Sequence, residues 1–368
     1  MKRIWKHAVP LLLMLAILAV PLSACSGGST GDATPPDSGD SAAANQPSAT
    51  YNWNLGCVNA DPSVVPDFNS WGHGVQKFVD LVAEYTDGQI TITPQWSSVL
   101  GGNPAMFEQM EMGELELYYG QPMSGADIRF GAWNIPYLFD TYEQIEAAVN
   151  PESGEIYALA DQWMGDHNAK LLSMAVGGIR GFANSKHEVI TPEDVLDLKV
   201  RAYEDTVVLE FWKGLGTASV LAIPDIYSSL QTGTVDGLEM HPTEIIKSKY
   251  YEVTDYYTDI DWQWVNSGVL VIGDQFWNQL TPELQEAVQR AATEAAEYQN
   301  QLQKEDTDRA YEVLEENGLQ VTLLTPEQKQ AWIDYGRSFD ATFSNMVGEE
   351  VFNQIMDISA KMKAEYPA

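Results

Sequence analysis

Basic side chains are scarce in this chain of 368 residues. Its 20 lysines and arginines stand against 53 aspartates and glutamates, which gives a formal net charge of −33. Nucleic acids and anionic membrane surfaces bind proteins through clustered positive charge, so neither is expected as a partner of the folded body. A hydrophobic fraction of 45% nevertheless supplies enough apolar material for a sizeable core and excludes a disordered chain.

Catalytic and metal-binding motifs are also missing. The sequence has no GxSxG nucleophile turn, no HExxH zinc helix and no glycine-rich phosphate loop. Its five histidines, His7, His73, His167, His187 and His241, show no metal-ligand spacing. We therefore expect a protein that is not an enzyme and that uses neither a cofactor nor a metal.

Cysteine is the third scarce residue, with Cys25 and Cys57 alone. Cys25 follows the basic start "MKRIWKH", the apolar stretch "AVPLLLMLAILAVPL" and the small residues "LSA", an order typical of a bacterial lipoprotein signal. Residues 1–24 are thus predicted to be a signal peptide and Cys25 the lipidated first residue of the mature protein. The alternatives are an ordinary secretory signal and a short membrane anchor. Cys57 then has no disulfide partner, and we expect it to be buried in the first strand.

Composition changes again after the predicted signal. Residues 25–50 are rich in Ser, Gly, Ala, Pro and Asp with almost no bulky apolar side chain, which predicts a flexible tether. No later segment approaches the roughly 18 consecutive apolar residues that a membrane-spanning helix needs. Anchor, tether and body together predict an extracytoplasmic protein held at the cell membrane, in the periplasm or at the cell surface.

From residue 51 onward, strand-like and helix-like segments alternate, which favours an α/β fold with largely parallel sheets. A helical stretch is expected at about residues 141–167, and a long helix from Pro282 to about Asn317. The segments are too many for one small sheet. We therefore predict two lobes, with a ligand bound in the crevice where strand ends of both lobes meet.

Arginine carries the main functional signal. Arg290, Arg309 and Arg337 lie in amphipathic helical stretches, whereas Arg180 and Arg201 stand at the ends of strand-like segments. Two guanidinium groups that converge on a crevice can hold a carboxylate through paired hydrogen bonds. The alternative is that each pairs with one of the many local carboxylates.

The segment from residue 178 to 242 resembles a known family. "GIRGFANSKHEVITPEDVLDLKVRAYE" followed by "YSSLQTGTVDGLEM" is similar to the extracytoplasmic solute-binding proteins of TRAP (tripartite ATP-independent periplasmic) transporters, the DctP-like family. "GQITITPQWSSVLGG" and "WNIPYLFDTYEQ" upstream, and "FWNQLTPELQEAVQRAATEAA" downstream, follow the family's order. The resemblance extends over about residues 51–360.

This resemblance implies a two-lobed α/β fold like that of periplasmic binding proteins, with hinged lobes and a long helix that crosses both. Lobe I is expected to comprise residues 51–177 and about 265–305, and lobe II residues 178–264 and about 306–368. In the family, the lobes close on a small organic anion, which then passes to the small and large membrane subunits of a sodium-coupled transporter.

The resemblance also implies site residues. The family's carboxylate-binding arginine lies in the "LK.R" block, which gives that role to Arg201, and the arginine before "NSK", Arg180, is expected to be a second anion contact. Some relatives bind their anion through a metal, but the stretch "EMHP" lacks the tryptophan that those carry, so no metal is expected. The other expected ligand contacts are Gln121, Tyr203, Glu239, His241, Asn266, and Trp71 and His73 from the loop after the first strand.

The function predicted from the sequence is that of a TRAP transporter receptor. Its expected partners are a small organic anion, such as a carboxylate, the TRAP membrane subunits, and the membrane through Cys25. It is expected to be a monomer. A lipoprotein that presents its ligand to a membrane receptor, and a surface-anchored enzyme, are the alternatives.

Overall fold

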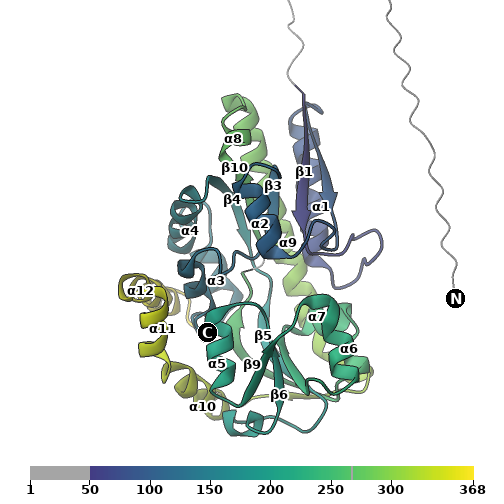
Figure 1. Ribbon diagram of the computed structural model, residues 1–368, viewed down its shortest axis with the longest axis vertical. Coiled ribbons are helices and arrows are strands. Elements are labelled where there is room, and N and C mark those ends of the chain that lie inside the picture. The colour runs from purple at the N-terminus through teal and green to yellow at the C-terminus, as the bar shows by residue number, and fades with distance from the viewer. Residues whose placement is uncertain (1–49, 267) are drawn as a thin grey trace, which may run out of the picture. The chain divides into compact units, whose positions relative to one another are not determined.

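Two mixed β-sheets lie at the centre of the part of the chain that the structure, a computed structural model, describes: residues 50–266 and 268–368 (Figure 1). The predicted signal peptide, the lipidated Cys25 and nearly all of the predicted tether lie outside these residues. They therefore remain predictions from the sequence.

The first sheet has the strand order β2-β1-β3-β10-β4. β1 is parallel to β2 and β3, whereas β10 is antiparallel to β3 and β4. In β1, Trp53, Leu55 and Cys57 are buried while Asn52 and Asn54 are exposed, so one face of the strand packs into the core. Burial raises the pKa of the Cys57 thiol to about 12, consistent with the inert buried cysteine predicted from the sequence. The strands are β1 (Tyr51–Cys57), β2 (Ile90–Gln95), β3 (Leu117–Gly120), β4 (Ala169–Ala175) and β10 (Gly268–Gly273).

The second sheet has the strand order β11-β9-β5-β8-β6-β7. β8 lies between β5 and β6, antiparallel to the former and parallel to the latter. This order brings three segments that are separate in the sequence, β5, β8 and β6, side by side. The strands are β5 (Ile179–Asn184), β6 (Lys199–Ala202), β7 (Thr217–Val220), β8 (Gly237–Met240), β9 (Tyr256–Trp264) and β11 (Gln320–Leu323).

Helices cover both sheets, and several begin directly after a residue whose side chain accepts a hydrogen bond from the first turn, as Asn69 does for α1 and Asp205 for α5. The α-helices are α1 (Ser70–Tyr85), α2 (Asn103–Glu111), α3 (Tyr142–Ala148), α4 (Glu155–Gly165), α5 (Thr206–Lys213), α6 (Ile226–Gln231), α7 (Pro242–Lys247), α8 (Asp274–Trp277), α9 (Pro282–Glu316), α10 (Pro326–Arg337), α11 (Asp340–Val347) and α12 (Glu349–Glu365). Short 3-10 turns are η1 (Ile128–Asn134), η2 (Pro192–Val195), η3 (Ile223–Asp225) and η4 (Tyr250–Glu252).

The chain crosses between the sheets in two neighbouring segments, from β4 to β5 and from β9 to β10. The two crossings are hydrogen bonded to each other: the Val265 amide donates to the Gly178 carbonyl at 2.8 Å, and the Gly177 amide donates to the Val265 carbonyl at 2.9 Å. Gly178 has a φ of +110°, a conformation that favours glycine. Paired crossings of this kind join the two sheets through very few residues.

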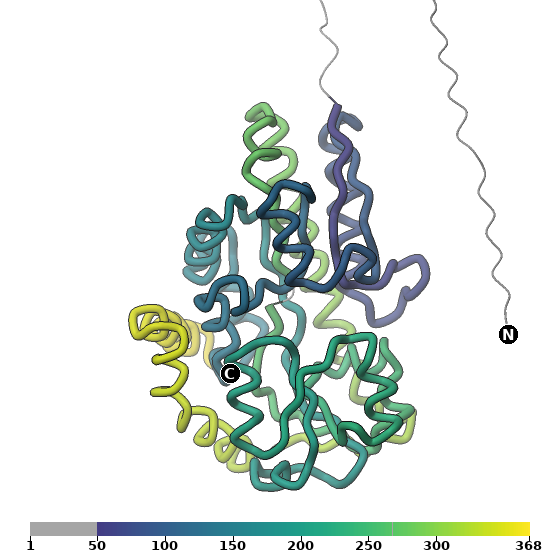
Figure 2. The backbone as a smooth tube through the Cα atoms, in the orientation of Figure 1, coloured from purple at the N-terminus to yellow at the C-terminus, as the bar shows by residue number. Residues whose placement is uncertain are grey.

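Helix α9 is the third connection between the sheets. Its 35 residues contact α1 and β4 near the first sheet and α7 and β11 near the second. Figure 2 shows the corresponding green tube running from one sheet toward the other. The sequence predicts this helix with nearly the same bounds.

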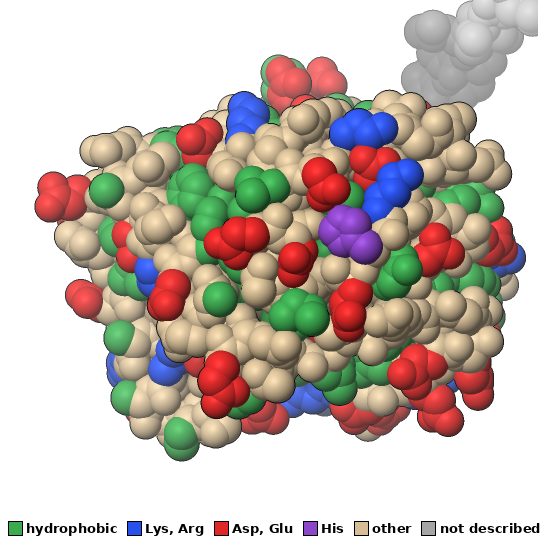
Figure 3. All heavy atoms as spheres, turned by 90° about the horizontal axis from the view of Figure 1, so that it is seen from below, with side chains coloured by type: hydrophobic (Ala, Val, Ile, Leu, Met, Phe, Trp, Pro, Cys, Tyr) green, Lys and Arg blue, Asp and Glu red, His purple; other side chains and the backbone are tan. Residues whose placement is uncertain are grey.

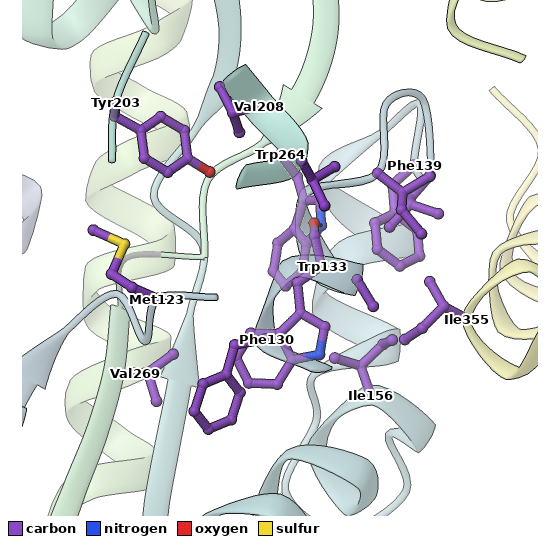
Figure 4. Close-up of a cluster of buried hydrophobic side chains, with 14 of the residues drawn as sticks. Met123, Phe130, Trp133, Phe139, Ile156, Tyr203, Val208, Trp264, Val269 and Ile355 are labelled. Atoms are coloured by element: carbon purple, nitrogen blue, oxygen red, sulfur yellow. Dashed lines mark hydrogen bonds between the residues drawn. The ribbon is translucent and has the colours of Figure 1, made fainter. Parts of the chain in front are cut away.

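A large aromatic core continues from one sheet to the other on the side of η1 and the C-terminal helices. Figure 4 shows Phe130 and Trp133 of η1 among side chains from α4, α5, β9 and α12. Trp133 stacks on Trp163 of α4 with ring centres 5.5 Å apart, and the Trp264 indole donates to the Trp133 carbonyl at 2.8 Å. The C-terminal helices α11 and α12 thus pack on η1, α3 and α4.

Several elements differ from the sequence-based expectation. The sheets are mixed rather than largely parallel. The single helical stretch expected at residues 141–167 is two helices, since Pro151 and Gly154 interrupt it. Helices α10, α11 and α12 follow β11 at the C-terminal end of the chain. Within residues 50–266 and 268–368, no helix has both the length and the apolar character needed to span a bilayer.

Candidate ligand-binding site

The strand order β5-β8-β6 places an acid between two arginines. Arg180 is in β5, Arg201 is in β6, and Glu239 is in the strand between them, β8. Phe182 of β5 lies opposite Glu239, and Arg201 lies opposite Leu238. Three charged side chains from segments far apart in the sequence therefore meet on the second sheet.

Glu239 pairs with both arginines. Its Oε2 accepts from Nη1 of Arg180 at 2.6 Å, and its Oε1 accepts from Nη1 of Arg201 at 3.1 Å. The backbone amide of Tyr203 donates to the same Oε1 at 3.1 Å. The carboxylate is fully buried, and Arg180 and Arg201 are only 5% and 3% exposed. Two positive charges thus share one negative charge away from bulk water.

The arginines are held firmly by other groups. Nε and Nη2 of Arg201 both donate to the Leu221 carbonyl at 3.2 Å, and the Arg180 guanidinium lies over the Tyr203 ring, 4.6 Å from its centre. Burial lowers the pKa of Arg201, and the Glu239 carboxylate acts in the opposite direction. An arginine remains charged under these conditions, so this site is a preorganised cation pair.

A cavity of about 280 Å³ opens in front of the arginines. Both sheets contribute to its wall: β6 and β8 with the segments that follow them, and on the other side α1, the segment before α2 and the end of β3. Gln121 Nε2 donates to the Tyr203 hydroxyl at 3.0 Å and so joins the two sides. Residues of several kinds line the cavity, among them Trp71, Asn103, Gln121, Arg180, Arg201, Tyr203, Glu204, Leu221, His241 and Glu244.

His241, directly after β8, and Trp71 of α1 lie side by side in the wall of this cavity. Their ring centres are 5.3 Å apart. Burial, with smaller contributions from the charges of Arg180 and Lys247, holds the pKa of His241 well below its usual value. The imidazole is therefore neutral at physiological pH.

Comparison with known proteins identifies the family. Residues 63–342 match the family described as bacterial extracellular solute-binding protein, family 7, or DctP. The chain belongs to this family. The C4-dicarboxylate-binding periplasmic protein DctP of Rhodobacter capsulatus is 25% identical over 312 residues, which cover 81% of this chain and 89% of that protein.

Two solved structures support the assignment to family 7. A TRAP periplasmic solute binding protein from Ochrobactrum anthropi is 28% identical, with a TM-score of 0.75, and the match covers 86% of this chain and 97% of that one. Another, from Chromohalobacter salexigens with bound D-glucuronate, is 25% identical, with a TM-score of 0.75 and coverages of 85% and 99%. The predicted two-lobed α/β fold and the predicted relation to TRAP solute-binding proteins are confirmed. Members of this family are binding proteins.

Most of the site residues predicted for this family 7 protein lie together. Arg201, Arg180, Tyr203, His241, Gln121 and Trp71 all line the cavity. Glu239 lies behind the arginines and is fully buried. Asn266 is buried in the crossing after β9 and does not line the cavity.

His73 faces a different depression of this family 7 protein, formed with Phe68 and Arg309, and its Nε2 lies 2.8 Å from the Pro66 carbonyl oxygen. Trp71 and His73 are two residues apart on α1, so their side chains point to different sides of the helix. Only Trp71 therefore reaches the cavity.

Other residues that line the cavity of this family 7 protein were not predicted from the sequence. Asn103 is the first residue of α2 and follows Gly101 and Gly102. The sequence "GGNP" is typical of a helix start, because proline is favoured in the first turn, and it could have predicted this part of the wall. Leu221 and residues 222–224 follow β7 and close the wall beside Arg201. Within the described residues, no cluster of three or more His, Cys, Asp or Glu side chains is arranged to hold a metal ion.

Proposed function

We propose that this protein is an extracytoplasmic receptor that captures a small organic anion between its two lobes and delivers it to the membrane subunits of a TRAP transporter. A carboxylate of the ligand binds Arg201, with Arg180 as a second contact. The observation that carries the proposal is the buried arginine pair, with a single shared acid, at the wall of a cavity to which both sheets contribute. D-glucuronate in one relative's structure and the dicarboxylate in another relative's name support an acid as the ligand.

The rest of the proposal concerns how the protein works at the membrane. Residues 51–177 and about 265–305 form lobe I, residues 178–264 and about 306–368 form lobe II, and the paired crossings act as the hinge. Closure excludes water from the cavity, which strengthens the attraction between the arginines and a bound carboxylate. Lipidation at Cys25 keeps this monomeric receptor near its transporter.

A thermal-shift screen tests the proposed binding. Dicarboxylates, sugar acids, aromatic acids, keto acids and sulfonates are offered separately to the purified protein. We expect a class of carboxylates to raise the melting temperature, since a ligand at 100 times its dissociation constant adds about 2.7 kcal/mol of stability.

Arg201→Ala should abolish that shift, while Arg201→Lys should keep a weaker one because it retains the charge but loses the planar pair of donors. The matched control is Arg290→Ala, which removes an exposed arginine that pairs with Glu294 on α9. Unchanged ligand affinity in Arg201→Ala would reject the site.

A further inference from the structure

The charges buried at the cavity leave room for one carboxylate. Arg180 and Arg201 carry two positive charges, and Glu239 cancels one of them. Two other acids lie at the cavity wall, and neither changes this balance. Glu244 already pairs with Lys247 at 2.5 Å, and Glu204 is exposed to solvent. A ligand with one carboxylate balances the site, whereas a second carboxylate would find no unpaired cation in the cavity wall and would lie near the exposed acid Glu204.

A chain of hydrogen bonds fixes the proton of His241. Ser70 of α1 donates to Oε1 of Gln303 at 2.6 Å, so Nε2 of Gln303 faces Thr243 and donates to its hydroxyl at 3.2 Å. The Thr243 hydroxyl lies 2.7 Å from Nδ1 of His241. The hydroxyl accepts from Gln303, and Nδ1 is the acceptor that the described residues offer to its own proton, so we assign Nδ1 as the acceptor of this hydrogen bond. The neutral ring then carries its single proton on Nε2.

Three buried N–H groups of residues that line this cavity have no hydrogen-bond partner among the described residues: Nε2 of His241, Nε1 of Trp71 and Nε of Arg180. All three residues line the cavity, and His241 is only 3% exposed. A buried N–H without a partner is costly, so each of these donors calls for a partner that the described residues do not supply. The two aromatic donors are neutral and therefore suit an uncharged oxygen.

We propose that this cavity selects monocarboxylates that carry a hydroxyl or carbonyl oxygen toward their far end, and that His241 and Trp71 donate to that oxygen. The inference rests on the proposed function, since it needs a carboxylate on the arginine pair. His241 is thus a specificity-determining residue, and Thr243 is a positioning residue that sets which of its nitrogens carries the proton.

Four-carbon acids of equal length separate the contributions. Butanoate, 4-hydroxybutanoate and succinate end in a methyl, a hydroxyl and a second carboxylate, and galactonate with galactarate extends the comparison to six carbons. By calorimetry, we expect the hydroxy monoacid of a pair to bind about tenfold more tightly than its diacid, and also more tightly than butanoate.

His241→Phe should bring the ratio of the butanoate and 4-hydroxybutanoate dissociation constants close to one, whereas His241→Gln should restore part of the preference through its amide donor. Thr243→Val should lower the same ratio of dissociation constants, because the hydroxyl that faces Nδ1 of His241 is lost. A diacid that binds as tightly as its monoacid would overturn the inference and leave the proposed function standing. If no acid of either kind binds, the proposed function fails, and the inference fails with it.

A measurement without ligand tests the proton position directly. In protein with ¹⁵N-labelled histidine, long-range ¹H–¹⁵N spectra at pH 7 should show a neutral ring protonated on Nε2, assigned by its loss in His241→Gln. A ring protonated on Nδ1, or on both nitrogens, would overturn the inference whatever the protein binds.

Discussion

At the scale of single residues, Glu239 is the group on which the arginine pair depends. Its carboxylate accepts from both guanidinium groups in a place that water does not reach. The buried acid makes it possible for two cations to lie side by side before a ligand arrives. Glu239 therefore contributes to the stability of the ligand-free protein at least as much as to ligand binding.

Glu239→Gln should lower the free energy of unfolding by about 3 kcal/mol, because two buried cations lose their counter-charge. Urea unfolding of the ligand-free protein measures this loss. Glu204→Gln removes an exposed acid from the same cavity wall and should change stability by less than about 0.5 kcal/mol. Equal stability of Glu239→Gln and the parent protein would show that the arginines do not need this acid.

The sequence predicts part of this site, whereas the rest depends on which strands lie side by side in the folded protein. Arg180 and Arg201 are conspicuous because cations at strand ends are rare in so acidic a chain. The position of Glu239 behind them follows from the strand order β5-β8-β6, which brings together side chains 59 residues apart. No local pattern specifies that order. The hydrogen-bond chain to His241 likewise needs Gln303, which lies 60 residues from Thr243.

At the scale of elements, β9 shows why some strands cannot be predicted from the sequence alone. "YYTDIDWQW" carries two aspartates, which are depleted in strands, yet it forms nine residues of β-structure between β5 and β11. Tertiary packing overrides the local preference, since Tyr257, Ile260, Trp262 and Trp264 are all buried. In contrast, the 35-residue helix α9 is predictable because its periodicity is sustained and Pro282 marks its start.

Asp259 in β9 gives a pH-dependent prediction. Burial, followed by the negative charge of Asp261, raises the pKa of Asp259 well above its usual value. Its Oδ1 has no hydrogen-bond partner among the described residues, while Asp261 pairs with Lys329 at 2.7 Å. A carboxyl with a raised folded-state pKa adds stability fully only below its unfolded pKa of about 3.9, and that contribution is lost as pH rises through the folded-state pKa.

Asp259→Asn should therefore become more stable relative to the parent protein as pH rises from about 4.5 toward neutrality, by at most about 1.4 kcal/mol per pH unit. Urea unfolding at several pH values gives the difference. Asp308→Asn, which removes an exposed aspartate on α9, should show no such trend. A difference between Asp259→Asn and the parent that stays constant with pH would contradict the prediction.

At the scale of the whole molecule, the excess of acid is distributed over the surface. Figure 3 shows one face, where aspartates and glutamates are scattered among few lysines and arginines. With 53 acids and 20 basic residues, like charges repel one another in the folded state. The buried arginines are shielded from this field, since salt screens interactions over about 8 to 10 Å at physiological ionic strength.

Raising sodium chloride from 20 mM to about 500 mM should increase the melting temperature of the protein, because screening weakens the repulsion between its surface acids. Sucrose at equal osmolality controls for effects of the cosolute that do not depend on charge. Differential scanning calorimetry compares the two series. A midpoint that falls with salt would mean that surface ion pairs outweigh the net repulsion.

Helix α9 has a mechanical consequence for the hinge. At 1.5 Å per residue it is about 52 Å long, and no proline or glycine interrupts it after Pro282. Such a rod is stiff, so we expect the lobes to rotate about its surface rather than bend it. Gln303, which binds Ser70 on one side and Thr243 on the other, lies where that rotation would shear the contacts. Opening of the lobes would then break the hydrogen bonds that keep the His241 proton on Nε2. The movement that opens the cavity to solvent would thus also lower the affinity for the bound solute.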